Sequence, residues 1–383
     1  MSPRWAILAG LVGCATVQTG VHRSEDLAAA PAMDSPAAVP APEPASWNTS
    51  RIAGAGFRNT PHEVARVQLA GPVEQLYTDG VRFFARAGSA VQMVRSGKVV
   101  WTQPIAARAL SLLADGVWVS RDQETARLDV GTGAVSERPT AGGELAAGVQ
   151  ALGESGRAWQ TRDGTIHTSA GWFLPFADVI DPAGGRSTTG LTSSGAGIAT
   201  DGAVVYAVSL DGLVIAADEK GERWRTALPA SPVGAPVLAP GAVLVAIAAA
   251  EGEPGGVLAL DRAGMPLWRA RSPAPCLAPA LGPDGNGGWS VYLANRSGEL
   301  YAFDLTSGKP RWDLSFEGAV TAMRVEDDVV LVGSADGTLS AVESSDGGVR
   351  WHTQIGTVTA SPVVVGGELW VGLADGGLVG LAE

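Results

Sequence analysis

Short hydrophobic runs that end in glycine-containing turns recur along most of the chain. The stretch "VGSADGTLSAVESSDGGVRWHTQIG", from Val332 to Gly356, holds an apolar run, an Asp-Gly turn, a second apolar run, another glycine turn and a Trp. The same order occurs in "YLANRSGELYAFDLTSGKPRWDLSF", which contains Trp312, and in "AVSLDGLVIAADEKGERWRTAL", which contains Trp224. Asp-Gly between alternating runs favours β-hairpins, because glycine accepts positive φ. The pattern therefore predicts a repeated unit of antiparallel strands.

The repeat has a period of about 40 residues. Trp residues recur at positions 224, 268, 312 and 351, and an earlier one stands at position 101. Such a period of short strands predicts a propeller or a solenoid, and runs rich in Val, Ala and Leu suit propeller blades packed on both faces. The pattern weakens between residues 101 and 224. There, Arg138 stands where we expect a Trp, and Trp172 is shifted from its expected place.

The two ends of the repetitive region complement each other. The C-terminal stretch "SPVVVGGELWVGLADGGLVGLAE" stops where a Trp-containing strand should begin, and "HEVARVQLAG", from His62 to Gly71, is a lone strand. If this lone strand completes the last blade, no open ring end is left. We predict an all-β, eight-bladed β-propeller of four-stranded antiparallel blades, closed by the N-terminal strand. The inner strands are expected to begin near residues 73, 107, 145, 195, 233, 276, 320 and 358. Seven blades is the second choice, because residues 140–195 are degenerate.

The N-terminal stretch "MSPRWAILAGLVGC" places a basic residue before an apolar run and then small residues. This order is typical of an export signal, and the run is shorter than the roughly 20 residues that span a membrane. We predict a signal peptide at residues 1–13, an Ala- and Pro-rich tether at 14–60 and the propeller at 61–383. "LVGC" resembles a bacterial lipobox, which implies that Cys14 is lipidated. Ala15 after that cysteine implies, by resemblance to known sorting rules, the outer membrane.

Composition disfavours several kinds of partner and chemistry. The 383-residue chain has a net charge of −12, which disfavours nucleic acid or anionic lipid as the main partner. Its two cysteines, Cys14 and Cys276, are too few for a disulfide framework or a cysteine metal site. We interpret Cys276 as a small buried thiol. The four histidines, at positions 22, 62, 167 and 352, show no metal-ligand spacing.

No catalytic motif emerges from the sequence. The G-x-S-x-G pattern of a nucleophile elbow is missing. Asp284 and Asn286 in "PDGNGG" have a spacing that a calcium loop could use, but calcium needs about six oxygen ligands. A hairpin turn is the simpler interpretation. We therefore predict no enzyme activity, no cofactor and no metal.

"GSADGTLSAVESSDGGVRW" and "GELYAFDLTSGKPRW" resemble the repeats of pyrroloquinoline-quinone-type β-propellers. The resemblance is strongest over residues 195–383 and extends more weakly to residue 62. It implies that the repeated Trp side chains dock between neighbouring blades in a structural role: Trp101, Trp224, Trp268, Trp312 and Trp351. A quinone-dependent dehydrogenase is a disfavoured alternative, because the chain lacks the adjacent Cys-Cys pair usual in those enzymes.

The lipobox, the tether and the propeller together resemble the B component of the outer-membrane barrel-assembly machinery, a propeller lipoprotein. This resemblance implies a non-catalytic scaffold, anchored by lipid to the periplasmic face of the outer membrane. Its partners would be envelope proteins, including the barrel-inserting core component. The family's partner-binding loops correspond here to residues 175–195, with these candidate residues: Phe176, Asp178, Ile180, Asp181 and Arg186. The alternative is a lineage-specific envelope lipoprotein that binds another protein or a polysaccharide.

Overall fold

The computed structural model describes residues 57–121, 124–137, 150–152, 156–161, 165–169, 173–174, 197–209, 212–249, 254–284 and 287–383. The regular elements in these ranges are all β-strands. Within the same ranges there is no helix that is both long and apolar enough to cross a membrane.

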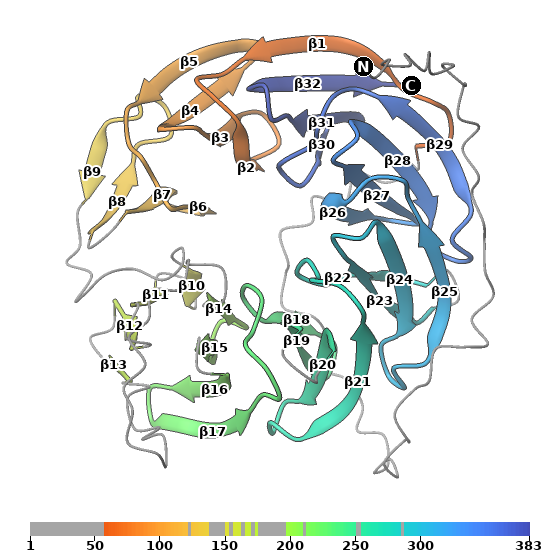
Figure 1. Ribbon diagram of the computed structural model, residues 1–383. Coiled ribbons are helices and arrows are strands. Elements are labelled where there is room, and N and C mark those ends of the chain that lie inside the picture. Colours follow the sequence, from red (N-terminus) through yellow and green to blue (C-terminus); the bar gives the residue numbers. More distant parts are fainter. Residues whose placement is uncertain are drawn as a thin grey trace, which may run out of the picture.

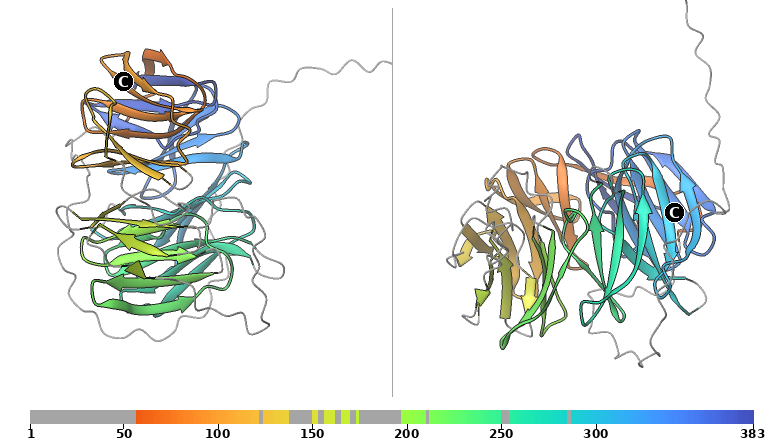
Figure 2. Two further views of the ribbon diagram at one scale, coloured as in Figure 1. Left: turned by 90° about the vertical axis from the view of Figure 1, so that its left-hand side faces the viewer. Right: turned by 60° about the horizontal axis from the view of Figure 1, so that its bottom comes forward.

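The strands form eight four-stranded antiparallel sheets, which are arranged as blades in a ring (Figure 1; Figure 2). We number the blades from the sheet that begins with β2. Blade 1 comprises β2 (Val73–Thr78), β3 (Phe83–Ala87), β4 (Ala90–Arg95) and β5 (Lys98–Gln103). Blade 2 comprises β6 (Ala109–Leu113), β7 (Gly116–Arg121), β8 (Glu124–Leu128) and β9 (Val135–Glu137). Blade 3 comprises β10 (Gln150–Leu152), β11 (Gly156–Gln160), β12 (Ile166–Thr168) and β13 (Phe173–Leu174).

Blades 4 to 7 repeat this order. Blade 4 comprises β14 (Gly197–Thr200), β15 (Val205–Ser209), β16 (Leu213–Asp218) and β17 (Gly221–Ala227). Blade 5 comprises β18 (Val237–Ala239), β19 (Ala242–Ile247), β20 (Gly255–Asp261) and β21 (Pro266–Ser272). Blade 6 comprises β22 (Ala280–Pro283), β23 (Trp289–Ala294), β24 (Glu299–Asp304) and β25 (Pro310–Ser315). Blade 7 comprises β26 (Val320–Glu326), β27 (Val329–Ser334), β28 (Thr338–Glu343) and β29 (Val349–Gln354).

Blade 8 closes the ring with strands from both ends of the chain. It comprises β30 (Val363–Val365), β31 (Glu368–Gly372), β32 (Gly377–Ala382) and, as its outer strand, β1 (His62–Gln68). β1 runs antiparallel to β32, from His62 opposite Ala382 to Gln68 opposite Gly377. The predicted eight-bladed ring and its closure by the N-terminal strand are thus confirmed.

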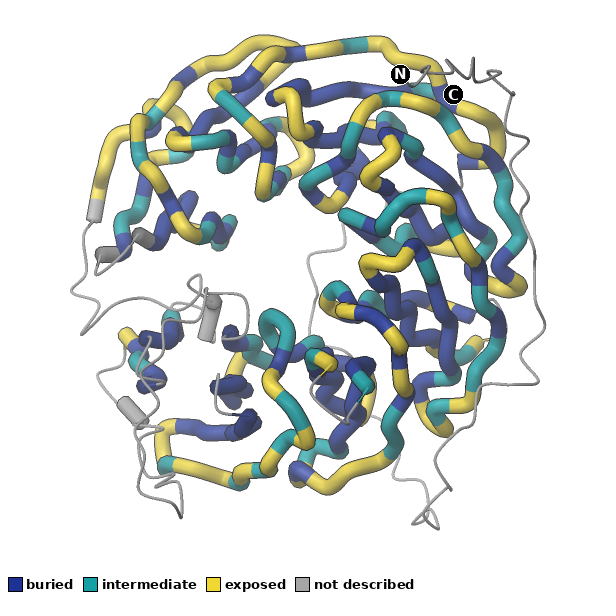
Figure 3. The backbone as a smooth tube through the Cα atoms, viewed as in Figure 1, coloured by how far each residue is buried: buried dark blue, intermediate teal, exposed yellow. Residues whose placement is uncertain are grey.

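Burial follows the position of a strand within its blade. All residues of β15, β16 and β19 are buried, because neighbouring blades cover both faces of these middle strands. The outer strands are buried mainly on one side, as in β29, where Trp351 is buried and His352 is exposed. Figure 3 shows the same gradient, with exposed backbone mainly along the rim. Middle strands can therefore be continuously apolar, whereas outer strands such as β17 and β29 place charged or polar residues on their exposed side.

A β-bulge precedes each docking Trp and fixes where that side chain points. In blade 6, Ala302 is opposite Trp312 and Phe303 is opposite Pro310, which leaves Arg311 without a partner in the register. In blade 2, the equivalent pairing places Glu137 opposite Arg127, with Ser136 as the extra residue. The residue at the Trp position of blade 2 is therefore Glu137, and the assignment of Arg138 from the sequence was wrong by one position.

Candidate functional site

Five outer-strand Trp side chains reach from one blade to the next. Each indole Nε1 donates a hydrogen bond to a backbone carbonyl across the boundary between two blades, which we call a seam. Trp101 donates to Val130 (3.1 Å), Trp224 to Arg262 (2.8 Å), Trp268 to Leu305 (2.7 Å), Trp312 to Ser344 (3.0 Å) and Trp351 to Phe57 (3.0 Å). A buried indole thus combines a large apolar contact with a satisfied N–H donor.

A glycine in the receiving blade forms the floor under four of these rings. Gly308 has φ +66°, and a Cβ at that position would lie 2.5 Å from Cγ and Cδ2 of Trp268. Gly133, Gly264 and Gly347 stand in the same relation to the Trp side chains of the blades before them. Gly264, Gly308 and Gly347 each stand four residues before a Trp of their own blade. Each of these glycines contacts the Trp of the previous blade, and the Trp that follows it docks on the next blade.

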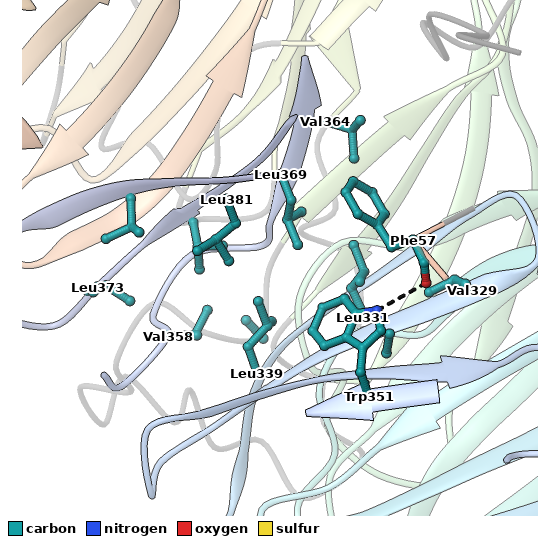
Figure 4. Packing of buried hydrophobic residues seen from close by; sticks show 14 residues of the cluster. Phe57, Val329, Leu331, Leu339, Trp351, Val358, Val364, Leu369, Leu373 and Leu381 are labelled. Carbon is teal, nitrogen blue, oxygen red and sulfur yellow. Dashed lines mark hydrogen bonds between the residues drawn. The ribbon is translucent and has the colours of Figure 1, made fainter. Parts of the chain in front are cut away.

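The seam between blades 7 and 8 is completed by a residue outside the repeats. The outer strand of blade 8 is β1, and the carbonyl of Phe57, which precedes β1, accepts the Trp351 hydrogen bond. The Phe57 side chain is 2% exposed and packs in a cluster with Val329, Leu331 and Val364 (Figure 4). The packed part of the chain thus begins before residue 61.

Arginines at the bulge positions of blades 6 and 7 each bind one acidic residue at the end of the third strand and one just after the first strand. Arg311 contacts Asp304 and Asp284 (2.6 and 2.7 Å), and Arg350 contacts Glu343 and Asp328. Hydrogen bonds from Arg350 hold the pKa of Asp328 below its usual value. These four ion pairs tie the outer strands of blades 6 and 7 to acidic residues nearer the centre of each blade.

The residues that could carry chemistry are accounted for by local contacts. Asp284 accepts hydrogen bonds from Arg311 and from the backbone N–H of Gly288, whereas Asn286 lies outside the described residues. The buried Cys276 thiol donates to the carbonyl of Ala274 (3.5 Å), and burial raises its pKa. His167 stacks on Trp159 with 5.9 Å between ring centroids. In the described part of the chain, no group of three His, Cys, Asp or Glu residues is placed to hold a metal ion.

The predicted lipidation site and partner loop fall outside the described residues. This applies to Cys14 and to the five loop residues: Phe176, Asp178, Ile180, Asp181 and Arg186. The loop lies between β13 of blade 3 and β14 of blade 4 along the chain. Sequence reasoning did not predict that the turn glycines contact the docked Trp rings, nor that Phe57 accepts the Trp351 hydrogen bond. The glycines carry a repeat signal that could have revealed them, whereas Phe57 has no repeat equivalent.

These features define the class of protein as an eight-bladed, pyrroloquinoline-quinone-type β-propeller whose repeats dock through Trp. The sequence model of the family described as "Outer membrane protein assembly factor BamB" matches residues 147–285 and 253–382, which together cover more than half of the chain. The chain therefore belongs to this family. No curated protein sequence matches it significantly.

Solved structures share the fold at low sequence identity. BamB from Moraxella catarrhalis has a TM-score of 0.65 and 16% identity, with 85% of this chain and 100% of that chain covered. The computationally designed Ika8 protein has a TM-score of 0.63 and 16% identity, with 84% and 99% covered. Sqt1 from Saccharomyces cerevisiae has a TM-score of 0.64 and 11% identity, with 85% and 99% covered. Such likeness shows the propeller fold alone, since one fold hosts many functions.

Proposed function

We propose that this protein is a non-catalytic scaffold of the bacterial outer membrane that binds partner proteins during assembly of outer-membrane β-barrels. The observation that carries the proposal is the match of the assembly-factor family over residues 147–382. The described side chains support a scaffold role. Arg311 and Arg350 are each paired with two carboxylates, and five Trp side chains are docked between neighbouring blades.

In this proposal the propeller is held to the periplasmic face of the outer membrane through lipidated Cys14. The motif "LVGC" and the Ala- and Pro-rich stretch up to residue 60 support such an anchor and tether. Because Pro-rich segments are extended, semi-rigid spacers, the tether would let the ring stand away from the lipid. The charge of −12 is consistent with attachment by lipid rather than by electrostatic adsorption to anionic membranes.

The partner we propose is the barrel-inserting core component, contacted through the loop between blades 3 and 4. Phe176 and Ile180 are apolar side chains that could fill pockets of a partner, and Arg186 is the cation of the loop. Anchors of this kind, flanked by charges, are the usual energetic centre of a protein interface. The adjoining strands β13 and β14 belong to different blades, so the loop is tethered at both ends to the ring.

The proposal is tested by binding the purified protein to the periplasmic domains of the barrel-inserting core component. Arg186→Glu is expected to weaken binding by about tenfold or more, because it reverses a charge at an interface. Arg95→Glu, at the exposed end of β4 in blade 1, is the matched control and should bind as the unchanged protein does. Equal binding by the two variants would rule out this loop. If the unchanged protein does not bind, the barrel-assembly role is wrong and another envelope partner has to be sought.

A further inference from the structure

The seam between blades 2 and 3 is built differently from the Trp-docked seams. Glu137 occupies the position at which five other blades place a docking Trp. The outer strand of blade 2 therefore has no Trp side chain at this position to dock on blade 3. The contacts that join the two blades in the described residues lie further inward, around Asp115 in the turn between β6 and β7.

Asp115 brings two arginines and a Trp together across this seam. Its carboxylate accepts hydrogen bonds from Nε1 of Trp118 (3.1 Å) and from Nη1 of Arg127 (3.3 Å), both in blade 2. It also forms an ion pair with Arg157, which comes from β11 of blade 3. The Arg157 guanidinium lies 4.5 Å from the centroid of the Trp118 ring, which is 1% exposed. The carboxylate thus holds the cation of one blade over the aromatic ring of the other.

The electrostatics of Asp115 agree with this role. Burial opposes its ionisation, but the hydrogen bonds from Trp118 and Arg157 and the charge of Arg157 outweigh that effect and keep its pKa below the usual value. The Asp115 and Arg157 side chains are 32% and 19% exposed. The pair is therefore partly accessible to solvent, and salt can weaken it.

The seam between blades 4 and 5 contains a matching arrangement of an acid, an aromatic ring and an arginine, and it also has a docked Trp. Asp201 accepts a hydrogen bond from the Tyr206 hydroxyl (3.1 Å) and pairs with Arg262 of blade 5 (3.7 Å). The Arg262 guanidinium lies 5.2 Å from the Tyr206 ring centroid. Here the docked Trp224 also donates to the Arg262 carbonyl. The two seams therefore share an acid–aromatic–arginine cluster and differ in the outer indole.

We propose that the seam between blades 2 and 3 opens more readily than the Trp-docked seams, and that the Asp115–Arg157 ion pair controls this opening. At a seam with a docked Trp, the indole still joins the two blades after the ion pair is lost. At the seam between blades 2 and 3, loss of the pair frees blade 3 from Asp115 and removes the cation from Trp118. The opened seam then exposes Trp118 and Trp159, which pack together with Leu113 in the closed ring.

The test is amide hydrogen exchange, read by mass spectrometry, on the full lipidated protein in mild detergent. Asp115→Asn keeps the shape of the side chain and removes its charge. It should accelerate exchange in β7 and β11 by roughly tenfold or more, because hydrogen bonds to charged groups are the strong ones. Asp201→Asn is the matched control and should change exchange in β15 and β16 by less than about twofold. Equal effects of the two substitutions, or no effect of Asp115→Asn, would overturn the proposal.

A third variant separates charge from packing. Arg157→Met keeps an apolar stem against Trp118 but cannot pair with Asp115, so it should accelerate exchange at the same strands as Asp115→Asn. Unchanged exchange in this variant would show that packing, not the ion pair, holds the seam. If the variants do not fold, the unchanged protein carries the test. Raising NaCl to 0.5 M, about the range in which screening is strong, should accelerate amide exchange in β7 and β11 more than in β15 and β16. An equal acceleration in all four strands contradicts the proposal.

Discussion

Replacing Gly308 with Ala tests whether the turn glycines form the floor for the docked indoles. Two costs are expected. The residue has φ +66°, a conformation that costs a non-glycine residue about 1–2 kcal/mol. In addition, the new methyl would lie 2.5 Å from the Trp268 ring, and overpacking of this kind costs about 1–3 kcal/mol. The free energy of unfolding should therefore fall by about 2–5 kcal/mol in total.

Gly97→Ala is the matched control, because Gly97 has φ +70° and open space where the Cβ would stand. It should lose only the backbone part, about 1–2 kcal/mol. Urea unfolding followed by far-ultraviolet circular dichroism gives both values. In a Trp268→Leu background the extra cost of Gly308→Ala should largely disappear, because the smaller side chain leaves room for the methyl. Equal losses for Gly308→Ala and Gly97→Ala, or an extra loss that persists without Trp268, would refute the indole-floor explanation.

Three further predictions concern ring closure and charge. Phe57→Ala should lower the free energy of unfolding by about 3–5 kcal/mol, the usual range for a buried Phe, whereas the exposed Arg58 should tolerate Ala; urea midpoints decide this. Deletion of residues 62–68 removes the strand that covers β32, so the protein should associate through that edge, which light scattering would detect; a stable monomer contradicts the closure. The pKa of Asp328 is lowered by its hydrogen bonds from Arg350. Its contribution to stability is therefore complete above about pH 4 and is lost as the pH falls through the folded-state value. Urea midpoints measured from pH 7 to pH 3 should decline less in Asp328→Asn; an identical decline would show that the pair is irrelevant to acid stability.

The sequence carries the architecture because each blade repeats one local code. Asp-Gly turns, apolar middle strands and a Trp before the next blade recur often enough to give the blade count, the closing strand and the approximate start of each inner strand. These signals are local, and they survive even where a single repeat is imperfect. The predicted inner strand near residue 320, for example, is β26, which begins at Val320.

Contacts between distant residues were harder to foresee. The Asp115 cluster joins Arg127 of blade 2 to Arg157 of blade 3, and only the folded ring brings these two residues together. Phe57 and Trp351 are in contact although they are 294 residues apart in the sequence, and Phe57 lies outside the repeats. The one-residue error at Glu137 has the same origin, since the bulge that sets the register can be counted only along a paired strand. The candidate loop at residues 175–195 and Cys14 stay predictions.

Affinity capture of the tagged, lipidated protein from gently solubilised native membranes, with mass spectrometry of the bound proteins, tests the proposed function most directly. The account predicts near-stoichiometric recovery of the barrel-inserting core component. That recovery should be lost with Arg186→Glu and kept with Arg95→Glu. Recovery of a different envelope complex, with the core component missing, would contradict a role in outer-membrane barrel assembly and leave a lipoprotein propeller with another partner.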